Sequence, residues 1–87
     1  MSLHRVIPGL YISDIRGSQD LHGLQSNGIT HIVQAMGGLT PPYRKYFQYK
    51  VLDVADVSSE NLMAYFEETG RWIKQAIQGG GSVLVHW

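Results

Sequence analysis

The sequence predicts one α/β domain in which helices lie against the faces of a sheet. The predicted elements run strand, strand, helix, strand, strand, helix, strand, and strands interleaved with helices are typical of layered α/β folds. The last predicted strand, residues 83–85, is apolar on both faces, as strands in the centre of a covered sheet are. A length of 87 residues suits one small domain.

Four further segments predict strands. Residues 6–7 and 10–12 are apolar and flank Pro8-Gly9, a dipeptide that predicts a tight bend between two short strands. Residues 30–35 are β-branched and apolar, which predicts a buried strand. Residues 46–54 alternate between polar and apolar side chains, which predicts a strand with one covered face.

A short helix is predicted between the second and third strands. Ser18 is its expected N-cap, and Asp20 falls in its first turn, where the helix dipole favours a carboxylate. Leu21 and Leu24 lie three residues apart on one face. Asn27-Gly28 supplies the expected left-handed C-cap.

A longer helix is predicted after Ser58 or Ser59, either of which can serve as its N-cap. Its apolar side chains recur at helical spacing and predict one buried stripe. The stripe consists of Leu62, Phe66, Thr69, Ile73 and Ile77. Three consecutive glycines, residues 79–81, follow the helix. Phosphate-binding glycine loops open a helix rather than close one, so this run predicts a C-cap and a turn.

Composition excludes several classes of function. Lys plus Arg and Asp plus Glu number 7 each, and this balance favours neither nucleic acid nor an anionic membrane as a partner. The chain has no cysteine, which excludes disulfides and thiolate metal sites. Its 4 histidines share no metal-ligand spacing, so the sequence predicts no metal and no cofactor, and His31 is expected to be structural. No apolar run approaches the roughly 20 residues that span a bilayer, and a cytoplasmic or nuclear protein is expected.

Six segments of the chain, taken in order, resemble landmarks of the small dual-specificity protein phosphatases, which belong to the cysteine-dependent protein tyrosine phosphatase superfamily. The segments are Ile7-Pro8-Gly9-Leu10-Tyr11-Ile12, Gly28-Ile29-Thr30-His31-Ile32-Val33, Ala55-Asp56, Glu60-Asn61-Leu62, Tyr65-Phe66 and Val83-Leu84-Val85-His86. The family signature is His-Cys, five residues, then Arg and Ser or Thr. Only its first residue is present here, as His86.

The resemblance implies a protein tyrosine phosphatase-like layered fold with a central mixed sheet flanked by helices, truncated after the central strand. It assigns residues 1–87 to the N-terminal part of a catalytic domain that ends at the position of the nucleophile. The expected fragment has incompletely covered core surface, so it is also expected to self-associate.

The resemblance also implies a chemistry for the intact domain. A cysteine thiolate attacks the phosphorus of phosphotyrosine, phosphoserine or phosphothreonine in a phosphoprotein, and a phosphocysteine intermediate forms. By position, Asp56 matches the general acid that protonates the leaving oxygen, whereas Asp53 is expected to lie within the preceding strand. His86 matches the histidine before the nucleophile. Trp87 occupies the nucleophile position and has no nucleophilic atom, so the 87 residues are expected to be inactive alone.

Two other functions remain open from the sequence. A non-catalytic, pseudophosphatase-type fragment could engage a partner of the active enzyme without turnover. An unrelated small α/β domain, such as a rhodanese-like module, also ends a central strand before a catalytic cysteine. The aromatic pair Tyr65-Phe66 on the helix that follows Asp56 argues against this last alternative.

Overall fold

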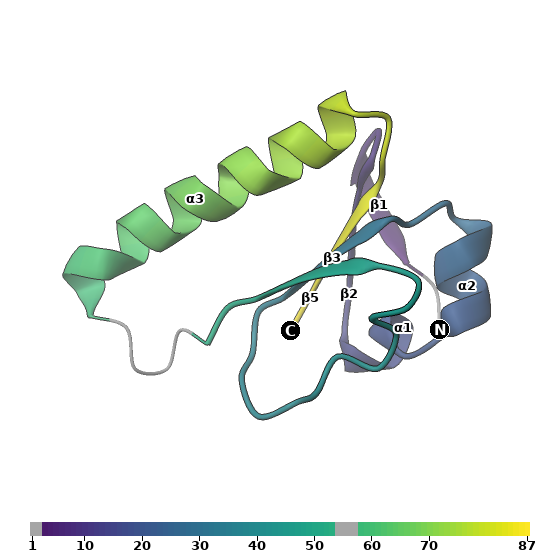
Figure 1. The fold of residues 1–87 in the computed structure, drawn as a ribbon, viewed down its shortest axis with the longest axis horizontal. Coiled ribbons are helices and arrows are strands. Elements are labelled where there is room, and N and C mark those ends of the chain that lie inside the picture. Colours follow the sequence, from purple (N-terminus) through teal and green to yellow (C-terminus); the bar gives the residue numbers. More distant parts are fainter. Residues whose placement is uncertain (1–2, 54–57) are drawn as a thin grey trace.

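A five-stranded sheet with helices on both faces forms the framework of the computed structural model, which describes residues 3–53 and 58–87 (Figure 1). Its strands lie in the order β1-β2-β5-β3-β4. β1 and β2 are antiparallel, and every other neighbouring pair is parallel, so the sheet is mixed, as predicted. The strands are β1 (His4–Ile7), β2 (Leu10–Ser13), β3 (His31–Gln34), β4 (Gln48–Val51) and β5 (Val83–His86).

The last strand, β5, is central, which confirms the prediction made from its two apolar faces. It pairs in parallel with β2 on one side and with β3 on the other. The Val83 N–H donates to the Gly9 carbonyl at 2.8 Å, and the Ala35 N–H donates to the His86 carbonyl at 2.9 Å. Both edges of β5 are therefore bonded along its whole length.

The predicted short helix is present as α2 (Leu21–Ser26), and a helix that was not predicted, α1 (Ile15–Ser18), precedes it. Ser18 ends α1 and caps nothing, so the predicted N-cap was wrong. Asp14 caps α1, and Asp20 caps α2 by accepting a hydrogen bond from the Gly23 N–H at 3.1 Å. An aspartate competes well with serine for this position, because its carboxylate also interacts with the helix dipole.

The long helix, α3 (Ser59–Gln78), begins and ends as predicted. Ser58 holds the N-cap position, although its side chain makes no capping hydrogen bond. At the other end, Gly80 adopts a positive φ of 89°, and the Gly81 N–H donates to the Ala76 carbonyl at 2.9 Å. The glycine run thus closes the helix. No helix in the described part of the chain has the length and apolarity required to cross a membrane.

The sheet has a hydrophobic cluster on each face. Helices α1 and α2 lie on one side of the sheet and α3 lies on the other (Figure 1). The cluster on the first side contains Leu24, Ile29, Ile32, Phe47 and Leu84. The cluster under α3 contains Val33, Leu52, Ala76 and Val83. Helices thus cover both faces of the central strand, as its apolar sequence requires.

Two predictions were wrong, one about the length of a strand and one about the burial of a side chain. The fourth strand covers only Gln48–Val51, rather than residues 46–54, because the chain turns through residues 43–47 before pairing begins. Phe66, which was assigned to the buried stripe of the long helix, is 53% exposed. Thr69 from the same stripe is buried, with its hydroxyl bonded to the Tyr65 carbonyl at 2.9 Å.

Candidate active site at the carboxyl ends of the parallel strands

Four parallel strands end at one edge of the sheet, and their last residues form a row. In register, Ser13 of β2 lies beside His86 of β5, His86 beside Gln34 of β3, and Gln34 beside Val51 of β4. Ser13, His86 and Gln34 are buried polar residues. Ligands of open α/β sheets bind outside the carboxyl ends of the strands. This edge is therefore the candidate active site.

His86 lies at the centre of this row and is only 1% exposed. Its backbone carbonyl is held by the Ala35 N–H, so the strand is ordered up to this residue. Its ring Nδ1 is buried and has no hydrogen-bond partner among the described residues. Burial lowers the pKa of His86 below its usual value of 6.5, so the imidazole is neutral near pH 7. A neutral ring with an unpaired buried nitrogen can bond one more group at this edge.

Gln34 is a site residue that the sequence analysis missed. Its side-chain amide donates to the Leu39 carbonyl at 2.7 Å and to the Met36 carbonyl at 3.3 Å. These bonds fasten the loop that follows β3 to the end of the strand. Its Oε1 is buried without a partner among the described residues. A polar residue directly after the buried apolar pair Ile32-Val33 was the available signal.

Asp14 contributes a carboxylate to this edge, directly after β2. Its oxygens accept from the backbone N–H groups of Arg16 and Gly17, at 3.0 and 3.2 Å, and pair with the Arg16 guanidinium at 3.1 Å. The Arg16 side chain and the Gly17 N–H hold the pKa of Asp14 below its usual value. An ionised carboxylate that caps a helix is poorly suited to donate a proton.

Asp53 also lies at this edge, two residues beyond the end of β4 and not within the strand as expected. Its carboxylate packs against Gly37 so closely that a Cβ at Gly37 would collide with it. Gly37 thus allows the loop after β3 to approach the segment after β4. Asp56, the predicted general acid, lies outside the described residues. Trp87 follows His86 and is 60% exposed.

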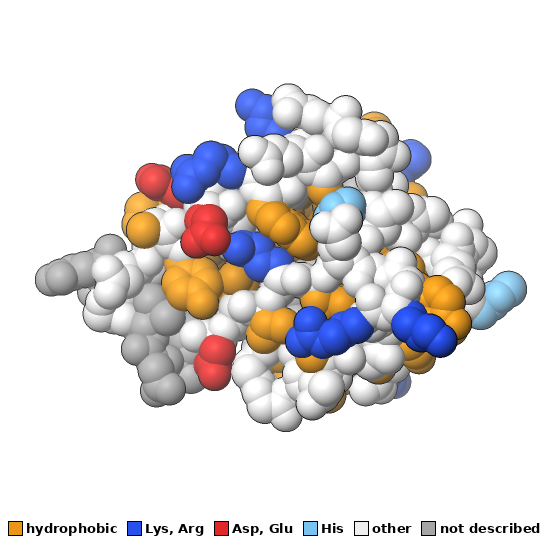
Figure 2. Space-filling view, viewed as in Figure 1, with side chains coloured by type: hydrophobic (Ala, Val, Ile, Leu, Met, Phe, Trp, Pro, Cys, Tyr) orange, Lys and Arg blue, Asp and Glu red, His pale blue; other side chains and the backbone are white. Residues whose placement is uncertain are grey.

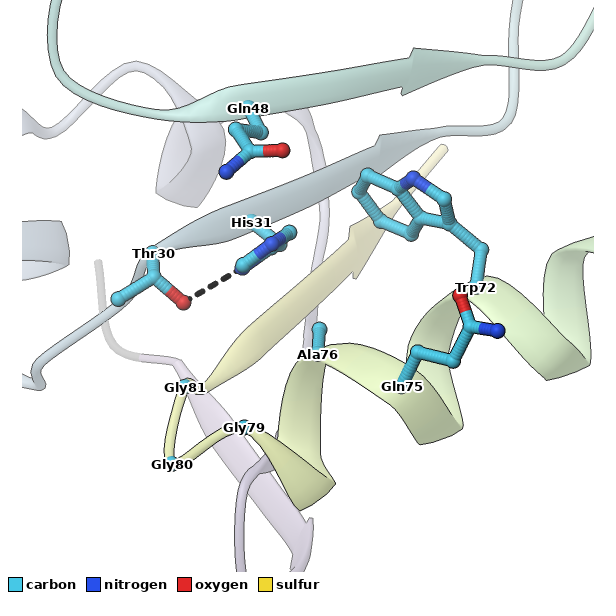
Figure 3. Close-up of a pocket in the computed structure, with 9 residues that line it drawn as sticks. All are labelled: Thr30, His31, Gln48, Trp72, Gln75, Ala76, Gly79, Gly80 and Gly81. Carbon is cyan, nitrogen blue, oxygen red and sulfur yellow. Dashed lines mark hydrogen bonds between the residues drawn. The ribbon is translucent and has the colours of Figure 1, made fainter.

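A groove of about 540 Å³ opens at the opposite end of the sheet (Figure 3). Its lining includes the amino ends of β3 and β4, the turn after α3, and Trp72. The His31 ring meets Trp72 edge-on, with ring centroids 5.2 Å apart, and its Nδ1 lies 2.6 Å from the Thr30 hydroxyl. Burial lowers the pKa of His31. These contacts join α3 to the sheet, which agrees with the structural role expected for His31.

Figure 2 shows basic, acidic and apolar side chains interspersed on the face viewed. Lys50 and Glu68 form one of the ion pairs, at 2.8 Å, between β4 and α3. Within residues 3–53 and 58–87, no group of three or more His, Asp or Glu side chains is placed to hold a metal ion.

Comparison with known proteins identifies the chain's relatives. No protein-family model matches it. It is 42% identical over 84 residues to dual specificity protein phosphatase 1B of Arabidopsis thaliana, and 38% identical over 84 residues to dual specificity protein phosphatase 22-A of Danio rerio. Each match covers 97% of this chain, with 50% and 40% of the relatives covered in turn. Over nearly its whole length, the chain is therefore similar to part of the dual-specificity phosphatases.

Solved structures share the fold of this chain. DUSP15 superposes with a TM-score of 0.84 at 30% identity over 98% of the chain. The human tyrosine phosphatase-like serine/threonine/tyrosine-interacting protein superposes with a TM-score of 0.81 at 34% identity, also over 98%. The match covers 54% and 61% of those two proteins. The chain thus spans about half the length of the proteins it matches, and the predicted phosphatase-like fold is confirmed.

Proposed function

We propose that residues 1–87 form the N-terminal part of a dual-specificity phosphatase catalytic domain that acts on phosphoproteins. In the complete domain, a cysteine thiolate attacks the phosphorus, an S–P bond forms, and the bond to the tyrosine, serine or threonine oxygen breaks. Water then attacks the phosphocysteine and releases phosphate. The 87 residues contain no cysteine, so they supply the scaffold for this chemistry and not its nucleophile.

The position of His86 carries this proposal. β5 brings it to the centre of the carboxyl edge, buried between the strand-end residues Ser13 and Gln34. In the family, the residue after this histidine is the nucleophile. The unpaired Nδ1 of His86 is suited to accept a hydrogen bond from the loop that carries the nucleophile, or to donate one to it. Such a bond would order that loop and favour the thiolate.

We assign the general acid to Asp56, on the resemblance and on its place in the chain. The described residues on either side of residues 54–57 are Asp53, beyond the end of β4, and Ser58, the N-cap of α3. An acid supplied from this segment would protonate the leaving oxygen, and its carboxylate would then accept a proton from the attacking water. Asp53 is the competing candidate, because it lies at the same edge.

A chimera tests both the proposed phosphatase function and the assignment of the general acid to Asp56. In it, residues 1–86 are followed by the unmatched part of the Arabidopsis relative, beginning at that protein's signature cysteine. We expect the chimera to hydrolyse a phosphotyrosine peptide and the 87-residue chain to show no hydrolysis. Asp56→Asn should lower kcat of the chimera by roughly 10²–10⁴-fold, with Asp53→Asn close to the parent. If Asp53→Asn lowered kcat and Asp56→Asn did not, the general acid would be Asp53. A folded but inactive chimera would refute the proposed function.

A second function is favoured by one relative. The chain is 35% identical over 91 residues to the mouse serine/threonine/tyrosine-interacting protein, whose human counterpart is described as tyrosine phosphatase-like. Because these 87 residues include no cysteine, they could bind a partner of the active enzyme without turnover. In that case the 87-residue chain should inhibit dephosphorylation of a phosphoprotein by the Arabidopsis enzyme. Arg44→Ala combined with Lys45→Ala, in the exposed loop before β4, should relieve that inhibition. Absence of inhibition would remove this alternative.

A further inference from the structure

The groove at the amino ends of β3 and β4 is separate from the candidate active site, which lies at the carboxyl ends of the same strands (Figure 3). Its volume of about 540 Å³ is in the range of pockets that hold small molecules. One wall is the start of the two strands, and the other is the end of α3 with the turn that follows it. A ligand bound here would leave the carboxyl edge of the sheet free.

The lining of this groove is polar but uncharged. Among the described residues that form it there is no Asp, Glu, Lys or Arg. The lining includes His31, whose pKa is lowered by burial, so its ring is neutral near pH 7. A phosphate would meet no cation here, and an ammonium group would meet no carboxylate. The groove therefore suits an uncharged ligand.

Two aromatic rings form a corner in the groove. The centroids of the His31 and Trp72 rings are 5.2 Å apart, and their planes meet at 78°. Trp72 reaches from α3 toward the strands and is partly exposed (Figure 3). A flat ligand stacked on the indole would therefore turn its edge toward the imidazole. The Thr30 hydroxyl lies 2.6 Å from His31 Nδ1, which leaves Nε2 as the ring nitrogen that can bond such an edge.

Two carboxamide side chains reach the groove from opposite walls, Gln48 from β4 and Gln75 from α3 (Figure 3). Both are exposed. Gln48 is the register partner of His31, so the two side chains lie next to each other on one face of the sheet. An amide presents a donor and an acceptor side by side. The edge of a ligand that faces His31 can thus form a pair of hydrogen bonds with Gln48.

Small residues keep the space between these walls open. A Cβ at Gly81 would lie 3.4 Å from His31 Nδ1 and 3.0 Å from the Ala76 carbonyl oxygen. A larger residue at position 81 would therefore crowd the floor of the groove. Gly80, in the same turn, has a φ of 89°, which also favours glycine. Ala76 itself contributes only a methyl group to the wall formed by α3.

The kinds of side chain in the lining distinguish between planar ligands. Glutamine amides pair with the N6 and N7 atoms of adenine, whereas guanine is bound through Arg or Lys and cytosine through Asp or Glu. The described lining offers two amides and none of those charged residues. Purine and pyrimidine rings also stack on aromatic side chains in a sequence-tolerant way. Stacking and amide pairing together favour adenine.

We propose that this groove binds the adenine base of a nucleoside, stacked on Trp72 with its N6–N7 edge paired to Gln48. Gln75, on the opposite wall, donates to a ring nitrogen on the other edge of the base. Because the lining is uncharged, the base is recognised and a phosphate attached to it is not. The inference is independent of the proposed function, since it uses only residues at the amino end of the sheet.

Nuclear magnetic resonance of the 87-residue chain tests the proposal. The chain has 2 tryptophans, so Trp87→Phe assigns the indole N–H signal of Trp72. Adenosine should shift that signal with a Kd below about 1 mM. Gln48→Ala should weaken binding by roughly 5- to 150-fold, and Gln75→Ala should also weaken it. Gln78→Ala is the matched control, because Gln78 is exposed at the end of α3 and outside the lining, and it should leave Kd unchanged.

The same titration is made with the chimera described above, in which the groove residues are unchanged, and the spectra show whether each variant is folded. Guanosine should bind at least about 5-fold more weakly than adenosine. Adenosine 5′-monophosphate should bind no more tightly than adenosine. The proposal would be overturned by an unshifted Trp72 signal in both proteins, by equal effects of Gln48→Ala and Gln78→Ala, or by tighter binding of the monophosphate. A chimera that binds adenosine but hydrolyses no phosphopeptide would refute the proposed function alone.

Discussion

Protonation of His86 couples the candidate site to the stability of the sheet. Its side chain is buried at the end of the central strand, and burial lowers its pKa below 6.5. The unfolded chain therefore binds a proton at a higher pH than the folded chain does. His31, half-buried against Trp72 at the other end of the sheet, is shifted in the same direction. Both residues stabilise the folded state in their neutral form.

The first prediction is a loss of stability below about pH 6.5. As pH falls through this window, the unfolded chain takes up protons that the folded chain does not, so the free energy of unfolding decreases. The decrease is at most about 1.4 kcal/mol per pH unit for the buried His86, and it is smaller for the partly exposed His31. Urea unfolding at pH 7.5 and pH 5.5 measures the decrease. His86→Gln should reduce it, and His22→Gln, at an exposed position, should not. If His86→Gln lost as much stability between pH 7.5 and pH 5.5 as the unsubstituted chain, His86 would not be the buried titrating group.

Each element depends on a small number of close contacts. The β1–β2 turn requires Gly9, which has a φ of 87° and lies under the Ile77 side chain of α3. Gly28, at the end of α2, has a φ of 71° and no atom within 4 Å of a Cβ position. Both glycines have a left-handed backbone, but only Gly9 has a neighbouring side chain in the way of a Cβ atom. Substituting each one therefore distinguishes the cost of backbone strain from the cost of packing.

The second prediction uses this pair. Gly28→Ala should cost about 1–2 kcal/mol, which is the strain of a left-handed backbone for an L-residue. Gly9→Ala should cost more, because its methyl group would also lie 3.1 Å from Ile77 Cγ2 and displace α3 from the sheet. Chemical denaturation of both variants measures the difference. Equal costs would indicate that Ile77 moves aside freely.

Periodicity and capping signals predicted the order and type of most elements. β5 was predictable because its apolar residues face both sides of the sheet. The separate helix α1 was not, because the Ser18 hydroxyl bonds back to the Ile15 carbonyl at 2.6 Å at the end of α1 instead of capping the helix that follows. The exposure of Phe66 was also not predictable, because helical spacing shows which residues share a face and not what covers it.

The candidate site was predictable only in part, because the sequence does not show which strands become neighbours in the sheet. The resemblance singled out His86, and the structure places it at the carboxyl edge, buried and neutral. Gln34 was missed because its importance depends on register: it lies beside His86 only after β3 and β5 pair. The role of Asp56 stays a prediction, as does self-association of the chain.

The whole molecule has two cores that meet at β5. Leu84 is completely buried in the cluster on the α1 and α2 side, and its neighbour Val83 is completely buried in the cluster under α3. A small domain buries a lower fraction of its surface than a large one, so its margin of stability is narrow. Damage to the central strand therefore affects both layers together.

The third prediction concerns this margin. Leu84→Ala should cost about 2–5 kcal/mol, because it removes buried methyl groups and leaves a cavity in the central strand. A loss of that size is comparable with the entire stability of a small domain, so the cooperative thermal transition should disappear. Val6→Ala, at a site that is 50% exposed in β1, is the control and should change the free energy of unfolding by less than about 0.5 kcal/mol. A cooperative transition in Leu84→Ala would mean that the central strand is not essential to the sheet.

The central place of β5 also determines when the sheet can form during synthesis. β2 and β3 are made early but have no contact with each other in the sheet, because residues 83–86 lie between them. Until the ribosome has released those residues, each of these strands exposes an unpaired edge of N–H and C=O groups, where chains tend to associate wrongly. Pairing over such long sequence separations is slow. The nascent chain therefore completes its sheet only after residues 83–86 have emerged, and chaperones that shield strand edges would act on it before then.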